Sequence, residues 1–133
     1  MGRSANFKRL FLIGAVWNWT ATLTLLLGYK WLFPMFDMAL PKYPVFLILF
    51  LGLAFIFGIG YYWVSLDITQ NHDIVKLGVI GKIFVFLAVA WAGFCGQVAW
   101  PLVGAGLVDF LFAVLFIVFL KSARENRTSG CSQ

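Results

Sequence analysis

Charged residues are scarce in this chain. Asp, Glu, Lys and Arg make up 11% of its 133 residues, whereas hydrophobic residues make up 62%. An ordinary soluble domain carries about 25% charged and about 45–50% apolar residues. A chain of this length cannot bury so much apolar surface in a water-facing globule, because small domains leave much of their surface exposed. The composition therefore excludes an ordinary soluble domain and predicts a single integral membrane domain over residues 1–133.

Cysteine and histidine are also scarce. The two cysteines, Cys95 and Cys131, form no Cys-x-x-Cys pair and have no metal-binding spacing, so we expect two unpaired thiols. The single histidine, His72, lies in a polar segment without further ligands nearby. This setting is typical of a loop residue and argues against a haem or metal site.

Known catalytic motifs are missing. The chain has no G-x-S-x-G, no H-E-x-x-H, no P-loop and no pair of intramembrane carboxylates. We therefore predict no catalytic residue, no metal and no cofactor, and we favour a non-enzyme without deciding the question. The net charge of +5 is scattered at the ends of apolar runs, so we expect contact with anionic lipid and no nucleic-acid binding.

The apolar residues fall into four runs, each long enough to cross a bilayer core of about 30 Å at about 1.5 Å per residue. The fold class is therefore all-α, an integral membrane bundle of four transmembrane helices. We predict the helices at about residues 10–33, 45–66, 74–98 and 102–120, with a polar tail over 121–133 that is disordered at its end.

The segments between the runs carry helix-stop and helix-start signals. Pro34 is expected to end the first helix, because proline lacks the backbone N–H that a helix needs. Asn71 and Asp73 are candidate N-caps for the third helix. Several glycines flank this central joint and favour close approach of a neighbouring helix: Gly52, Gly58, Gly60, Gly78 and Gly81.

An even number of spans places both termini and the central joint on the same side of the membrane. The opposite side carries only Lys30 and Lys42. The positive-inside rule therefore predicts that both termini and the joint are cytoplasmic. The basic residues on that side are Arg3, Lys8, Arg9, Lys76, Lys121, Arg124 and Arg127.

Asp109 is the most informative polar residue. It lies about 17 Å along the helix axis from Lys121, close to the middle of the bilayer. A carboxylate at that depth costs about 2.5–3.5 kcal/mol, so it should face the bundle interior and have a partner. Gly106 and Ala113 share its helix face and are small enough for a neighbouring helix to come close.

Lys82 is the best candidate partner for Asp109, but two alternatives stay open. Lys82 can extend to the cytoplasmic headgroups or to Asp67 and Asp73, which is the simpler interpretation. Asp109 can also be neutral, because burial disfavours the charged form of a carboxyl group, and then hydrogen bond to Asn18 or a threonine.

Further polar residues reach a similar depth on the other helices, and together they predict an intramembrane polar patch. The simpler alternative is that the threonines bond their own helix carbonyls and that Asn18 joins two helices. The predicted patch consists of Asn18, Thr22, Tyr61, Tyr62, Lys82 and Asp109.

The central stretch supports a family resemblance. It reads Gly58-x-Gly-Tyr-Tyr, then Asp67, Asn71, Ile74-Val75 and Leu77-Gly78-x-x-Gly81-Lys82. This pattern resembles small, mostly uncharacterised bacterial four-helix membrane proteins of the DoxX-like group. The resemblance implies a four-span protein of the bacterial inner membrane that serves as an accessory subunit of quinone-linked oxidation complexes. No catalytic residue of that family matches a position here.

Three functions follow as hypotheses. The first is a non-catalytic packing or accessory subunit that contacts the lipid bilayer and other membrane subunits or copies of itself. The second is a small oligomeric transporter or channel that uses Asp109 and Lys82. The third is a membrane enzyme that acts on a lipid or a quinone at the polar patch.

Overall fold

The computed structural model describes residues 2–130, and within that range it contains four α-helices and no strand. All four helices are long and apolar enough to cross a membrane, which confirms the predicted fold class. The protein is therefore a small integral membrane bundle. The helices are α1 (Gly2–Met35), α2 (Pro44–Leu66), α3 (His72–Phe94) and α4 (Trp100–Gly130).

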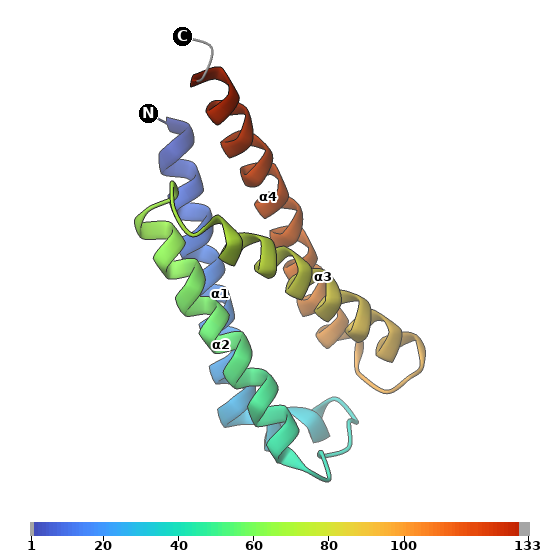
Figure 1. Ribbon diagram of the computed structural model, residues 1–133. Coiled ribbons are helices and arrows are strands. Elements are labelled where there is room, and N and C mark those ends of the chain that lie inside the picture. Colours follow the sequence, from blue (N-terminus) through green and yellow to red (C-terminus); the bar gives the residue numbers. More distant parts are fainter. Residues whose placement is uncertain (1, 131–133) are drawn as a thin grey trace.

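The helices form two antiparallel hairpins, α1 with α2 and α3 with α4 (Figure 1). Both chain ends and the α2–α3 connection lie at one end of the bundle, which we call the terminal end (Figure 1). The two hairpins meet there and diverge toward the other end, which we call the far end (Figure 1). The two hairpin loops still meet at the far end, where the Ala99 N–H donates to Met38 Sδ at 3.3 Å.

Aromatic side chains hold the hairpins together at the terminal end. The ring of Phe11 stacks on Phe116 with centroids 4.7 Å apart and meets Phe119 edge-on at 4.9 Å. Tyr61 brings α2 into the same cluster, 5.0 Å from Phe116. These side chains are almost fully buried, whereas Trp91 and most other large apolar residues face outward, as lipid contact requires. The core is thus one aromatic layer near the terminal end.

The first and last helices are longer than expected. α1 begins at Gly2, about two helical turns before the first apolar run. α4 continues to Gly130, where a polar tail was expected. Packing explains the difference, because Phe7 of the α1 extension meets Phe119 edge-on with centroids 5.1 Å apart and Ala123 of the α4 extension packs against the same core. The last part of the expected tail, including Cys131, lies outside the described residues.

The end of α1 differs by two residues from the expected stop at the proline. The helix includes Pro34 and ends at Met35. Asp37 then adopts a left-handed conformation with φ 54°, and the N–H of Met38 donates to the carbonyl of Phe33 at 2.8 Å. This Schellman arrangement satisfies helix carbonyls at the terminus and reverses the chain toward α2.

α3 ends in the same way and earlier than expected. The helix stops at Phe94 rather than near residue 98. Gly96 has φ 70°, and the N–H of Gln97 donates to the carbonyl of Ala92 at 2.8 Å. A glycine tolerates this left-handed conformation without a Cβ clash, so the turn forms where the glycine stands.

The α2–α3 connection is organised by Asp67 rather than by the expected N-caps. Asn71 occupies the N-cap position but is left-handed, with φ 60°, and its side chain makes no capping hydrogen bond. The Asp67 carboxylate accepts hydrogen bonds from Thr69 N (2.9 Å), Thr69 Oγ1 (2.6 Å) and Gln70 Nε2 (2.8 Å). The bonds from Thr69 lower the pKa of Asp67 below its ordinary value.

Two glycines next to this connection allow the close helix contacts that were expected of them. An added Cβ at Gly58 would lie 2.6 Å from the indole nitrogen of Trp19, and one at Gly78 would lie 2.6 Å from the Tyr61 hydroxyl. A real Cβ does not approach so closely. Gly81 differs, because a Cβ there would meet nothing within 4 Å.

Candidate functional site

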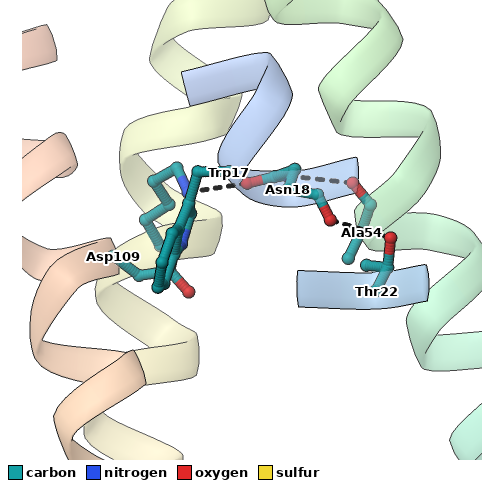
Figure 2. Close-up of polar contacts among 6 residues, drawn as sticks. Trp17, Asn18, Thr22, Ala54 and Asp109 are labelled. Carbon is teal, nitrogen blue, oxygen red and sulfur yellow. Dashed lines mark hydrogen bonds and ion pairs between the residues drawn. The ribbon is translucent and has the colours of Figure 1, made fainter. Parts of the chain in front are cut away.

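A polar cluster joins three helices inside the bundle (Figure 2). The Lys82 Nζ atom on α3 lies 2.5 Å from Asp109 Oδ1 on α4 and donates a hydrogen bond of 3.0 Å to Asn18 Oδ1 on α1. Only 5% of Lys82 is exposed. Lys82 therefore pairs with Asp109 in the bundle interior and does not extend to the headgroups or to Asp67 and Asp73.

Asp109 has a second partner that the sequence pattern did not predict. The indole N–H of Trp17 donates to Asp109 Oδ1 at 3.2 Å (Figure 2). A tryptophan in mid-span is distant from the interfacial belts, and a buried indole N–H needs an acceptor, which is the signal that could have pointed to Trp17. We call Trp17, Asn18, Lys82 and Asp109 the polar cluster.

Asn18 is the residue that ties the hairpins together. Its amide Nδ2 donates to the carbonyl of Ala54 on α2 at 2.9 Å, while its Oδ1 accepts from Lys82 on α3 (Figure 2). Both ends of the amide are therefore used, as a buried asparagine requires. Thr22 donates instead to the carbonyl of Asn18 at 2.7 Å, one turn back on its own helix, and does not join the cluster.

The two tyrosines of the predicted patch lie in different places. Tyr61 is 1% exposed, and its ring centroid lies 5.5 Å from Lys82 Nζ. The ring centroid of Phe112 lies 5.3 Å from the same Nζ atom, so two aromatic rings contact the ammonium group. Tyr62 is 39% exposed and contacts Trp19 at 6.0 Å between ring centroids, so it lies apart from the cluster.

The polar cluster forms part of the wall of a cavity of about 380 Å³ between the two hairpins, which we call the inter-hairpin cleft. All four helices line it, and nearly all the remaining lining is apolar. Phe33, Leu47 and Leu102 also line the cleft and lie at the far end of their helices. The cleft therefore runs from the charged pair toward the end where the hairpins diverge.

Asp109 offers the cleft an unused acceptor. Both hydrogen bonds that the carboxylate receives end on Oδ1, and no donor among the described residues reaches Oδ2. The Asp109 side chain is 21% exposed, compared with 6% for the Lys82 side chain. The lysine is thus enclosed by its partners, whereas the carboxylate remains open to an incoming hydrogen-bond donor.

The described residues contain no group of three or more His, Cys, Asp or Glu side chains that could hold a metal ion. His72 lies at the terminal end, where its Nε2 lies 2.8 Å from the carbonyl of Ile68. Cys95 is an exposed, unpaired thiol just after α3. Neither residue contributes to the inter-hairpin cleft.

Comparison with known proteins adds no relative. No protein-family model matches the chain, and no curated protein and no solved structure matches it. Function is therefore inferred from the geometry of the cleft and of the polar cluster.

Proposed function

We propose that this protein binds a small, largely apolar molecule within the membrane, in the inter-hairpin cleft, with a hydrogen-bond donor of that molecule on Asp109. The observation that supports the proposal is a half-enclosed charged pair in the wall of an otherwise apolar cavity. Ligand sites typically have this composition, with few polar groups that fix orientation and a volume of about 300–1,000 Å³.

The alternative of simple helix packing explains the cluster less well. A buried ion pair is often replaceable by apolar residues without loss of stability, so packing alone gives little reason to place it near mid-membrane. A purely structural pair would also be closed on all sides, whereas Asp109 lines the cleft and its Oδ2 receives no hydrogen bond from a described residue. Gly81, next to Lys82, also lines the cleft, and a Cβ at this position would meet nothing within 4 Å.

The charges of the cluster select the kind of polar group. Lys82 and Asp109 neutralise each other, so the cluster as a whole has no net charge to attract an ion. An anionic group would face the Asp109 carboxylate, and a carbonyl would meet an acceptor. A hydroxyl or amide N–H donates to Oδ2 without such a conflict. The best match is an apolar molecule with one hydroxyl group, such as a long-chain alcohol, a sterol-like ring system or a hydroquinone.

The test fills the cleft without touching the charges. Gly81→Leu places a side chain in the cleft, and Gly52→Leu is the matched control, because Gly52 also has open space around it and does not line the cleft. The probe is a fluorescent long-chain alcohol added to the full-length protein in nanodiscs. We expect at least about tenfold weaker binding for Gly81→Leu and no change for Gly52→Leu.

The methyl ether of the same alcohol tests the role of Asp109. The ether lacks the hydroxyl hydrogen and should bind about tenfold or more weakly, because Oδ2 then loses its donor. Equal binding of alcohol and ether, or equal binding to both glycine variants, would contradict the proposal.

A transporter is the second candidate, and the arrangement of the hairpins favours it. At the level of the charged pair, the side-chain hydrogen bonds between the hairpins are those of Trp17 to Asp109 and of Lys82 to Asn18. A rocking motion of one hairpin against the other has to break these bonds and the bond from the Ala99 N–H to Met38 Sδ between the hairpin loops, and to reshape the aromatic layer. Asp109→Asn should then abolish flux of the alcohol across proteoliposomes, whereas a variant that keeps full flux would remove this candidate.

The role of an accessory subunit, the DoxX-like resemblance and a place in a bacterial inner membrane remain proposals on the sequence pattern. A ligand-binding subunit of a larger membrane complex or of a homo-oligomer would be consistent with these proposals and with the cleft. An enzyme that acts on a lipid or a quinone would use the same cleft. Purification in mild detergent followed by mass spectrometry tests for partners. A reporter fused at Gln133 tests the proposed cytoplasmic termini, and an extracytoplasmic signal would reverse the orientation.

A further inference from the structure

A second cavity, of about 300 Å³, lies at the terminal end among α1, α4 and the start of α3, and we call it the terminal pocket. It shares no lining residue with the inter-hairpin cleft. Phe7 and Phe119 are among its apolar lining residues. Its polar lining consists of Arg3, Ser4, Thr69, His72, Ser122 and Asn126.

Ser122 is the observation that points to a ligand. It is 6% exposed, so more than nine-tenths of the residue is buried. The other buried or half-buried serine and threonine hydroxyls of the bundle, on Ser65 and Thr22, donate to carbonyls of their own helices. Ser122 makes no hydrogen bond with any described residue. Because no fully enclosed side-chain oxygen or nitrogen among the described residues lacks a partner, the Ser122 oxygen is not fully enclosed. The Ser122 hydroxyl therefore opens into the terminal pocket that it lines.

Three further polar groups of the pocket are available as donors. Arg3, Ser4 and Asn126 form no hydrogen bond or ion pair with the described residues. No Asp or Glu lines the pocket, so the Arg3 guanidinium makes it positive. His72 is the one polar lining residue from α3, and its ring meets Phe119 edge-on at 5.5 Å.

The N-terminus of α3 lies beside the pocket, and the charge of Asp73 in its first turn is balanced by Lys76 at 2.7 Å. α3 begins at His72, and Asn71 makes no side-chain capping bond to its first turn. The N-terminus of a helix carries free N–H groups and the positive end of the helix dipole. An arginine, hydroxyl groups, an amide and a helix N-terminus around one cavity form a typical set of partners for a phosphate group.

We propose that the terminal pocket binds a phosphate group, with Arg3 as the charged contact and Ser122 as a buried hydroxyl donor. The phosphate can belong to a phospholipid headgroup or to a free phosphate-bearing molecule, since both present the same oxygens. Arg3 supplies the fork of N–H donors that matches two phosphate oxygens. The site is separate from the inter-hairpin cleft, so either proposal can fail without the other.

The experiment uses the full-length protein and two probes. Inorganic phosphate is added to the protein in a neutral maltoside detergent without phospholipid, so that no headgroup phosphate competes, and binding is followed by isothermal titration calorimetry. Phosphatidylglycerol is added to the protein in detergent, and retained lipid is counted by native mass spectrometry. Binding of the first probe indicates free phosphate as a ligand, and retention of the second alone indicates a lipid headgroup.

Two variants and two matched controls identify the site. Arg3→Gln and Ser122→Ala each remove one donor and should weaken binding of the retained probe by about tenfold. Arg9→Gln removes the same charge from an exposed position outside the pocket, and Ser65→Ala removes a buried hydroxyl that already has a carbonyl partner. Both controls should bind within about twofold of the unchanged protein.

Circular dichroism confirms that each variant is folded. The proposal is overturned if neither probe binds, or if Arg9→Gln weakens binding as much as Arg3→Gln does, which would indicate attraction to net charge alone. It is also overturned if Ser122→Ala binds as tightly as the unchanged protein.

Discussion

Lys82 and Asp109 face each other from neighbouring helices, with Nζ of the lysine 2.5 Å from Oδ1 of the aspartate. Asn18 and Trp17 approach the same pair from α1, so a contact within one hairpin is fixed by two side chains of the other. The charges are therefore held by a network rather than by a single bond. Removing any one member leaves a buried polar group without its partner.

Breaking the pair on one side should be strongly destabilising. Lys82→Met leaves the Asp109 carboxylate in the bundle without a cation, and we expect a loss of about 3–5 kcal/mol in the free energy of unfolding. The double variant Lys82→Met with Asp109→Leu should recover most of that loss, because no unpaired charge remains. Unfolding in mixed detergent micelles, followed by tryptophan fluorescence, measures both.

The surface pair of Lys76 and Asp73 provides the control. Its atoms are 2.7 Å apart, but the side chains are 62% and 90% exposed. Lys76→Met should therefore lower the free energy of unfolding far less than Lys82→Met does. If Lys76→Met and Lys82→Met lower the free energy of unfolding equally, burial does not determine how much the Lys82–Asp109 pair contributes to stability.

Removing the Asn18 amide should loosen the contact between the hairpins. Asn18→Leu leaves one Lys82 N–H without its acceptor, and the carbonyl of Ala54 loses a second donor. We expect a loss of about 1–2 kcal/mol, the upper range for interhelical hydrogen bonds in membranes. Thr22→Val removes a hydroxyl that bonds only its own helix and should cost clearly less. Equal losses in the two unfolding experiments would refute the bridging role of Asn18.

The four spans could be predicted from the sequence because bilayer thickness fixes the length of an apolar helix. The helix ends were harder, since they depend on tertiary contacts. α1 and α4 extend past the apolar runs because Phe7 packs on Phe119 and Ala123 packs against the same core, and a hydropathy pattern does not contain these contacts. α3 ends early because Gly96 adopts a left-handed turn.

The partners of Asp109 could be predicted only in part. Its depth demanded an interior position and a partner, and only Lys82 offered a cation within reach. Helix rotation decides whether a lysine at that depth points inward or toward the headgroups, and sequence alone does not fix rotation. The rotation of α2 likewise decides which tyrosine faces inward. Tyr61 lies against Lys82, whereas Tyr62 lies outside the cluster.

The Asp67 carboxylate should titrate below its ordinary pKa of 3.8, because Thr69 donates two hydrogen bonds to its charged form. This stabilisation is fully present above the ordinary pKa and is lost as the pH falls through the lowered pKa of the folded protein. NMR of the labelled carboxyl carbon in micelles measures the pKa. Thr69→Ala removes the hydroxyl donor and should raise the pKa of Asp67 toward the ordinary value. An unchanged pKa in that variant would contradict the assignment.

Two glycines on the same helix should respond in opposite ways to alanine. At Gly78 the added Cβ would lie 2.6 Å from the Tyr61 hydroxyl, 2.7 Å from Cε1 and 3.1 Å from Cζ, so it meets the edge of the ring and not only its tip. Tyr61 is 1% exposed and cannot turn away, so Gly78→Ala should cost about 1–3 kcal/mol. At Gly81 the Cβ meets nothing within 4 Å, and the better helix propensity of alanine should stabilise the protein by up to about 1 kcal/mol. Thermal unfolding of both variants in one detergent compares them directly, and a loss of equal size at Gly81 would mean that the wall of the inter-hairpin cleft is closed.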